Sequence, residues 1–75
     1  MKKKQISFEF IQECGKDFTP SHKITAWAKQ NRMEISNRYF NTYVKVNGIE
    51  YTYHHYHIEA TENGKEKVTI YMEEI

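Results

Sequence analysis

Residues 5–13 alternate between apolar and polar side chains, and Ile6, Phe8 and Phe10 fall on one side of this alternation. A period of two residues is typical of a strand that is buried on one face. Gly15 interrupts the pattern shortly after it. The sequence therefore predicts a half-buried strand at the start of the chain, which we expect at an edge of the sheet.

A helix is predicted to begin at Thr19. Threonine is favoured at the N-cap, and Pro20 fits the first helical position, where its missing N–H costs nothing. The helix is expected to fade near Arg32, because Asn31 and residues 35–37 are poor helix formers. Helical spacing predicts a narrow buried stripe, with Trp27 packed near Phe8, Phe10 and Val44; its members are Ile24, Trp27, Ala28 and Asn31.

The second half of the chain is interpreted as three strands joined by two tight turns. The first covers residues 39–46, with Phe40 and Val44 on its apolar face. Asn47-Gly48 then predicts a two-residue hairpin, because both central residues of a type I′ turn need positive φ. The predicted fold is α+β with the order β-α-β-β-β, in which one helix packs on one face of a mainly antiparallel four-stranded sheet. We expect one domain over 1–75, with residues 1–4 flexible.

The apolar positions change parity within the third of these strands. Tyr51 and Tyr53 are apolar at odd positions, whereas Tyr56 and Ile58 are apolar at even ones. A shift of one residue exchanges the two faces of a strand, so we expect a β-bulge at His54-His55. The bulge places Tyr56 and Ile58 inside and His57 outside, and it needs a three-residue loop over 62–64. A regular strand with a two-residue loop would instead bury His57.

Composition excludes several classes of function. The chain has 75 residues, no leucine, one cysteine and a net charge of +1. A balance so close to neutral argues against a purely electrostatic nucleic-acid binder. No apolar run is long enough to cross a bilayer, so we expect no membrane partner and a cytoplasmic protein. The excess of lysine over arginine, with much Ile, Asn and Tyr, is typical of AT-rich coding sequence from a low-GC bacterium or its phage.

Candidate chemistry is sparse. His54, His55 and His57 form the single cluster that could bind a metal, but a zinc site needs three or four ligands. We interpret them as solvent-facing histidines beside a bulge. Cys14 shares the parity of the apolar residues of the first strand, so we expect it against the core and not as a nucleophile. The sequence therefore predicts no enzyme, no cofactor and no metal site.

Tyrosines supply the strongest surface feature. The predicted strands place three of them on the sheet face away from the helix, where histidines join them. Tyrosine is enriched at the energetic centres of protein–protein interfaces, and aromatic side chains on an open sheet can also stack on nucleic-acid bases. The candidate partner-binding residues are Tyr39, Tyr43, Tyr71, His55 and His57.

An alternative surface lies on the predicted helix, where Lys23, Lys29 and Arg32 stand off the apolar stripe. A basic face of this kind favours an acidic partner or nucleic acid. A helix-turn-helix with a wing over residues 24–48 is a weaker interpretation, because Tyr39, Phe40 and Tyr43 suit a strand better than a recognition helix.

From these features we expect a small, soluble, non-enzymatic binding protein, either a monomer or a homodimer. It would act stoichiometrically on a protein partner, as a phage or mobile-element inhibitor of a host factor such as a defence nuclease does. The alternative is a nucleic-acid-binding regulator that uses the basic helix or the aromatic sheet face.

Overall fold

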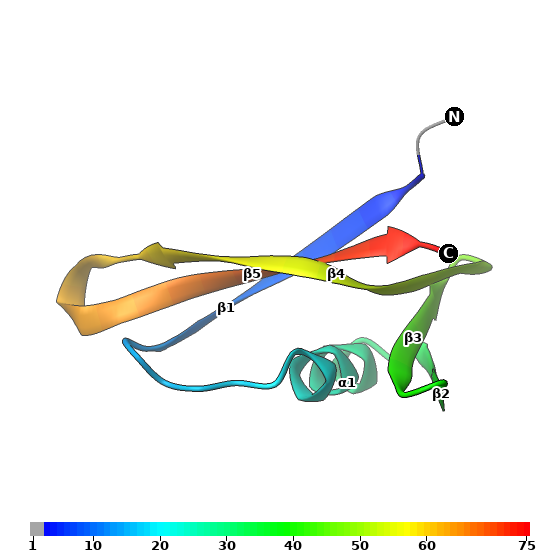
Figure 1. Ribbon diagram of the computed structural model, residues 1–75, viewed down its shortest axis with the longest axis horizontal. Coiled ribbons are helices and arrows are strands. Elements are labelled where there is room, and N and C mark those ends of the chain that lie inside the picture. Colours follow the sequence, from blue (N-terminus) through cyan, green and yellow to red (C-terminus); the bar gives the residue numbers. More distant parts are fainter. Residues whose placement is uncertain (1–2) are drawn as a thin grey trace.

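One helix and five antiparallel strands make up the computed structural model, which describes residues 3–75 (Figure 1). The α+β class and the single helix are confirmed, but the sheet has five strands instead of four, in the order β1-β5-β4-β3-β2. The elements are β1 Gln5–Glu13, α1 Pro20–Gln30, β2 Glu34–Arg38, β3 Asn41–Val46, β4 Ile49–Ala60, a 3₁₀ turn Glu62–Gly64, and β5 Lys65–Glu74.

The additional strand is β2, which the sequence did not predict. It pairs with β3 through a register that sets Ile35 opposite Val44 and Arg38 opposite Asn41. The predicted strand over 39–46 is therefore wrong at its start, because Tyr39 and Phe40 form the turn of a β2–β3 hairpin. Phe40, expected on the buried face, is fully exposed.

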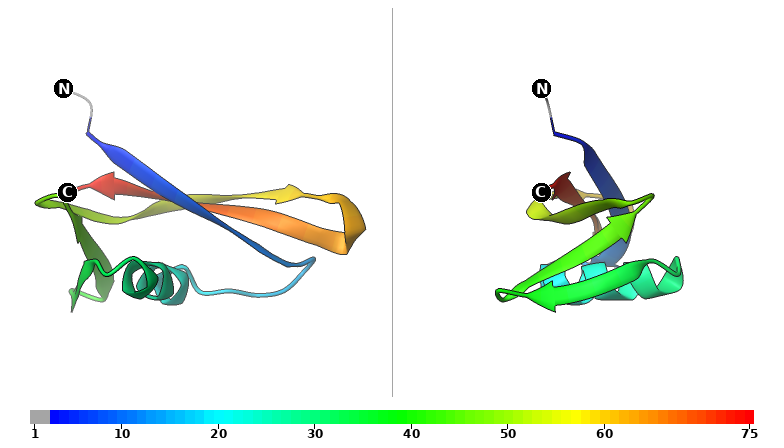
Figure 2. Two further views of the ribbon diagram at one scale, coloured as in Figure 1. Left: turned by 180° about the vertical axis from the view of Figure 1, so that it is seen from behind. Right: turned by 90° about the vertical axis from the view of Figure 1, so that its right-hand side faces the viewer.

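The sheet is strongly bent (Figures 1 and 2). Strands β4 and β5 form one long hairpin, and β1 crosses behind it in Figure 1, paired with β5. The β2–β3 hairpin turns away at one end and lies beside α1. The helix therefore covers the apolar side of the sheet at that end and leaves the far end of the β4–β5 hairpin without a helical cover.

Helix α1 begins as predicted, with Thr19 at the N-cap and Pro20 as its first residue, although the Thr19 side chain makes no capping hydrogen bond. It ends at Gln30 in a Schellman motif. The Met33 N–H donates to the Ala28 carbonyl at 2.9 Å and the Arg32 N–H to that of Lys29 at 3.2 Å. Arg32 takes the left-handed position of this motif, with φ of 56°.

Seven apolar residues form the buried core, and they come from α1, β3, β4 and β5. Trp27 joins this core as predicted by stacking on Phe8, with ring centroids 4.6 Å apart and planes 8° apart. Asn31, expected in the buried stripe, is instead exposed, and its side-chain amide donates to the Trp27 carbonyl. The core residues are Ile24, Ala28, Val44, Tyr51, Val68, Ile70 and Met72.

The segment between β1 and α1, which precedes the helix in the chain, covers another part of the apolar face. Phe18 contacts Phe10 edge-to-face at 5.5 Å and Tyr56 at 5.0 Å between ring centroids. Phe10 and Phe18 are half-buried and Tyr56 is exposed. The fold thus has a well-packed end under α1 and a thinner aromatic end.

The bulge in β4 is confirmed. The register between β4 and β5 shifts between Tyr53 and His55, after which Tyr56 pairs with Ile70 and Ile58 with Val68. The loop over residues 62–64 has the expected three residues, and His57 is exposed. The predicted burial of Tyr56 and Ile58 is wrong, because their side chains are 46% and 40% exposed on the end of the face that α1 does not reach.

The tight turn at Asn47-Gly48 is also confirmed. Val46 and Ile49 flank it as a cross-strand pair, and both central residues have positive φ, at 52° and 83°.

The sequence predicts flexible residues at positions 1–4. Met1 and Lys2 lie outside the described residues, whereas the Lys4 backbone exchanges hydrogen bonds with Glu74.

Replacing Trp27 with alanine should destabilise the fold by about 3 kcal/mol, the lower end of the range for a large aromatic side chain, because Trp27 is only half-buried. Denaturant unfolding followed by circular dichroism measures this. Lys29→Ala, an exposed change on the same helix, is the control and should leave the midpoint nearly unchanged. Equal midpoints for the two variants would show that the Trp27–Phe8 stack does not hold the helix.

Candidate functional site

Tyr43, one of the three predicted partner-binding tyrosines, lies on the sheet face opposite α1, because its neighbours Thr42 and Val44 are buried on the helix side. The Arg38 guanidinium covers its ring at 4.2 Å from the centroid. Arg38 also donates a hydrogen bond to the Glu50 carboxylate at 2.9 Å. The Tyr43 ring is therefore half-buried beneath an ion pair of the same molecule.

A second stacked pair lies on β4 and β5 of the same face. The His55 ring stacks on Tyr71 with centroids 4.6 Å apart. The Nδ1 atoms of His54 and His55 are 2.6 Å apart, a hydrogen-bond distance, and His54 Nε2 lies 3.5 Å from a Glu73 carboxylate oxygen. Tyr71 is thus also covered by a side chain of its own chain.

Ion pairs cross the rest of this face. Lys67 bridges the Glu9 carboxylate on β1, at 3.1 Å, and the Glu59 carboxylate on β4, at 3.5 Å. The hydrogen bond to Glu9, followed by the charges of both carboxylates, raises the pKa of Lys67 above its ordinary value. The face predicted as an open aromatic patch is therefore a network of charges, in which Tyr43 and Tyr71 already have partners and His57 stands exposed.

Tyr39 does not lie on that face as a strand residue, which corrects the sequence prediction. Tyr39 and Phe40 are the two central residues of the β2–β3 turn, with φ of 53° and 64°. Tyr39 is 81% exposed and Phe40 is fully exposed. Positive φ is rare for bulky residues, because the Cβ atom crowds the backbone, and it marks strain. We call this pair the aromatic turn.

The aromatic turn lies beside a groove on the helix side of the molecule. The groove has a volume of about 240 Å³ and a mainly apolar lining, in which Phe40 stands next to the start of α1 and the middle of β4. Pro20 and Ile24 supply the α1 side of the groove, and Tyr53 supplies the β4 side. Burial and the neighbouring Tyr56 raise the pKa of the Tyr53 hydroxyl above its ordinary value.

The three residues of the predicted basic surface have local contacts on the helix. Lys23 places its ammonium 4.6 Å from the centroid of the Phe10 ring, a cation–π contact. Lys29 lies in the last turn of α1, and Arg32 follows the C-terminal end of the helix. Positive charge is favourable at both places, because the C-terminal end of a helix carries the negative pole of its dipole. Each of these cations therefore interacts with the fold that carries it.

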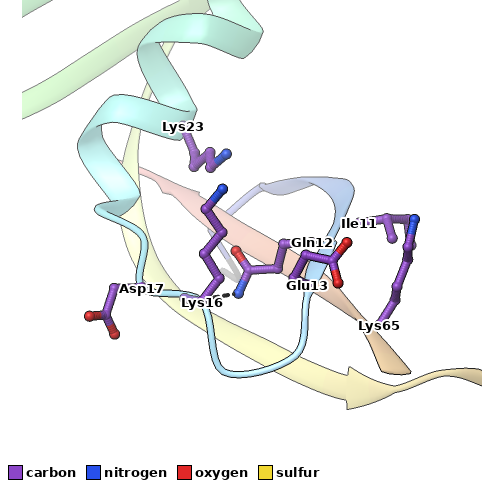
Figure 3. Close-up of a pocket in the computed structure, with 7 residues that line it drawn as sticks. All are labelled: Ile11, Gln12, Glu13, Lys16, Asp17, Lys23 and Lys65. Atoms are coloured by element: carbon purple, nitrogen blue, oxygen red, sulfur yellow. Dashed lines mark hydrogen bonds between the residues drawn. The ribbon is translucent and has the colours of Figure 1, made fainter. Parts of the chain in front are cut away.

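Sequence reasoning missed one hollow that gathers cations. Its volume is about 270 Å³, and its lining includes Lys16, Lys23 and Lys65 together with two acidic residues. Figure 3 shows Lys16 and Lys23 extending toward the same opening while Asp17 points away. Gln12 closes the base by donating to the Lys16 carbonyl at 2.8 Å. No sequence motif joins these positions, because Lys16 comes from the connecting segment, Lys23 from α1 and Lys65 from β5, and only the tertiary fold brings them together.

Three further sequence predictions concern Cys14, a metal site and a membrane-spanning segment. Cys14 is exposed, which corrects its expected place in the core, because the chain has already left β1 there and its N–H bonds the Gly64 carbonyl at 3.1 Å. Within residues 3–75 no three His, Cys, Asp or Glu side chains are grouped as a metal site would need. No helix in the same range is long and apolar enough to span a membrane.

Replacing the aromatic turn with Tyr39→Asn and Phe40→Gly should stabilise the fold by about 1–3 kcal/mol. Each of the two bulky residues in the left-handed region costs about 1–2 kcal/mol, and the greater freedom of glycine in the unfolded chain offsets about 0.5–1 kcal/mol of the gain. Little packing is lost, since both side chains are exposed. The reverse exchange at the other tight turn, Asn47→Tyr with Gly48→Phe, should destabilise by a similar amount. Chemical unfolding of both variants tests this; a less stable Asn-Gly variant at 39–40 would show that the aromatic pair supports the fold.

The Arg38–Glu50 pair predicts a pH effect. The hydrogen bond from Arg38 lowers the pKa of Glu50 below its ordinary value. A carboxylate with a depressed folded-state pKa stabilises the fold above its unfolded pKa, and this contribution disappears as the pH falls through the folded pKa. NMR titration should find the Glu50 carboxyl below its ordinary range in the native protein and near it in Arg38→Ala. Lys45→Ala is the control, with a smaller change; equal titrations in all three proteins would contradict the pairing.

Comparison with known proteins assigns the chain to no family. No protein-family model matches the chain, and no curated protein and no solved structure is similar to it.

Proposed function

We propose that this chain is a non-enzymatic binding protein that acts stoichiometrically on a protein partner, and that the aromatic turn is the centre of its contact surface. The single observation that carries the proposal is the pair Tyr39-Phe40, two large aromatic side chains held in the left-handed region and exposed to solvent.

Folding does not account for these two residues. Their side chains bury little surface, and their backbone conformation favours asparagine and glycine. The same molecule uses Asn47-Gly48 at its other two-residue turn, where the cheaper residues are present. Local rules that a sequence breaks without an internal gain are expected at functional sites. An external contact supplies the reason that the fold lacks.

The chemistry around the turn suits a protein partner. Tyrosine and arginine are enriched among the residues that carry most of the energy of protein interfaces. Arg38 is held in place by Glu50 and by the Tyr43 ring, so its orientation is fixed before a partner arrives. A two-residue turn also fixes the backbone that carries Tyr39 and Phe40. Preorganised side chains lose little entropy on binding, which favours affinity.

The groove beside Phe40 offers the complementary half of such a contact. Its apolar lining can accept one side chain of the partner while Phe40 inserts into a pocket of that partner. Residues that dominate an interface often pair with a pocket on the opposite surface. The sheet-face tyrosines, Tyr43 and Tyr71, would then lie outside the centre of this contact surface.

As the output of this binding we propose inhibition of a host factor, such as a defence nuclease, by a phage or mobile-element protein. The AT-rich type of composition and the exposed, strained aromatic turn support this class. A binder that occupies its target with a preformed aromatic surface needs no chemistry of its own.

The test compares the native chain with the Tyr39→Asn, Phe40→Gly variant as baits in extracts of the source cells, with and without nuclease treatment. Once the partner is purified, the variant should bind it at least tenfold more weakly, since each lost central residue costs about 2 kcal/mol or more. Tyr71→Ala is the matched control and should bind within a few-fold of the native chain.

Two outcomes would contradict the proposal. Native-level binding by the turn variant would show that the aromatic turn is not the contact surface. Capture that disappears with nuclease and falls steeply with salt, together with loss of binding on replacing Lys23, Lys29 and Arg32 by alanine, would instead support the nucleic-acid alternative.

A further inference from the structure

Strand β4 has a long edge that no other strand of residues 3–75 covers. Its pairing with β3 ends at the Tyr43–Thr52 pair, and residues 53–60 pair with β5 alone. In Figure 1, β1 passes behind this part of the sheet and the β2–β3 hairpin has already turned away from it. Open edges of this kind pair readily with another strand unless they are short, charged or covered.

The backbone of this edge presents regularly spaced hydrogen-bonding groups. The Thr61 N–H donates to the Lys65 carbonyl at 2.9 Å, which fixes the phase of the β4–β5 ladder. In an antiparallel pair, successive residues direct their backbone N–H and C=O groups alternately toward the partner strand and away from it. Thr61 bonds to β5, so the N–H and C=O groups of Tyr56, Ile58 and Ala60 point away from β5. They stand free for a strand added at this edge.

The side chains distinguish this edge from the other open ones. Tyr56 and Ile58 lie 46% and 40% exposed on the apolar side of β4. On β1, Phe8 stacks on Trp27, and Phe10 is covered by Phe18 and by the Lys23 ammonium, whereas Tyr56 on β4 meets the edge of Phe18 and stays nearly half exposed. Strand β2 has only five residues. Added strand pairing on β4 would therefore bury apolar surface that the fold leaves in water.

We propose that this edge pairs with the same edge of a second copy of the chain, antiparallel about a two-fold axis at Ile58. This register sets the two Ile58 side chains against each other and Tyr56 against Ala60 of the second copy, all on the apolar side. On the opposite face it sets each His57 against Glu59 of the other copy. The groups that point away from β5 then bond to one another across the axis.

Charge complementarity and the position of β3 select this register. An axis at Tyr56 would set His55 against His57 of the second copy, where no opposite charge is available. An axis at His57 would place Thr61 of the second copy across from Tyr53, next to the end of β3, where the Thr52 hydroxyl already donates to the Thr42 carbonyl. The register at Ile58 avoids both conflicts.

This inference goes beyond the proposed function and does not depend on it. The aromatic turn takes no part in the β4 pairing, so a dimer would present two such turns. The two proposals can therefore fail separately.

Sedimentation velocity of the full chain over a wide concentration range tests the dimer. The native chain should shift from monomer to dimer with rising concentration. His57→Glu sets acid against acid, and Glu59→Lys sets base against base. Because a cross-strand charge pair contributes about 0.2–1 kcal/mol and occurs twice, each variant alone should dimerise roughly tenfold more weakly. Glu59→Lys leaves Lys67 its contact with Glu9 but sets a second ammonium opposite Lys67 within the chain, so the folding of this variant has to be checked.

Mixing the two variants gives the decisive measurement. In the mixed pair, one contact keeps the native His57 against the native Glu59. The other sets the carboxylate introduced by His57→Glu against the ammonium introduced by Glu59→Lys. The two weakened chains should therefore recover association as a one-to-one heterodimer, whereas a merely structural role for either residue would not be rescued by mixing.

Two further measurements keep the result independent of folding defects. Circular dichroism checks that each charge variant is folded. Ile58→Lys sets two ammonium groups on the axis and should abolish the dimer by itself, because like charges directly opposite each other on paired strands are destabilising.

The controls separate this proposal from the previous one. The Tyr39→Asn, Phe40→Gly variant should dimerise like the native chain, whatever its effect on partner binding. A native chain that stays monomeric at every concentration would overturn the self-pairing and leave the edge to a strand of another protein. A native dimer that persists in both charge variants and in Ile58→Lys would place the contact elsewhere.

Discussion

Burial of Val68, Ile70 and Met72 on one side of β5 is the constraint on which the rest of the fold depends. Strand β5 lies between β1 and β4, so its buried face fixes the register of both neighbours. The bulge at His54 follows from it, because β4 can keep apolar side chains opposite Ile70 and Val68 only by inserting one residue. A regular β4 would have turned His57 and Glu59 to the apolar side, and it would have moved Tyr56 and Ile58 to the opposite face. The partial burial of Tyr56 against Phe18 would then be lost.

The same constraint leaves surface for which the chain has no internal cover. Helix α1 has eleven residues and lies at the end of the sheet where β2 and β3 bend toward it. The far end of the β4–β5 hairpin carries apolar residues in phase with the core but receives only Phe18 from the connecting segment. The exposed apolar side of Tyr56 and Ile58 is therefore a consequence of a helix shorter than the sheet that it covers.

Charge pairing explains why the opposite face of the sheet is less available than its tyrosines suggest. Arg38 lies over Tyr43 and His55 over Tyr71, so both rings are half-buried against groups that belong to networks ending in carboxylates. Lys67 joins β1 and β4 across the same face. A partner would have to displace these contacts, whereas Tyr39 and Phe40 need no displacement.

The sequence by itself determined the features that rest on local periodicity and backbone preference. These are the strand at residues 5–13, the helix start at Pro20, the Asn47-Gly48 turn and the bulge, whose parity change is visible in the order of Tyr53, Tyr56 and Ile58. Tertiary structure alone decided the β2–β3 hairpin, because its Tyr39-Phe40 turn has no glycine or asparagine to mark it and Ile35 becomes a strand residue only by pairing with Val44. It also decided exposure: alternation assigns a side chain to a face, but whether that face is covered depends on where the helix ends.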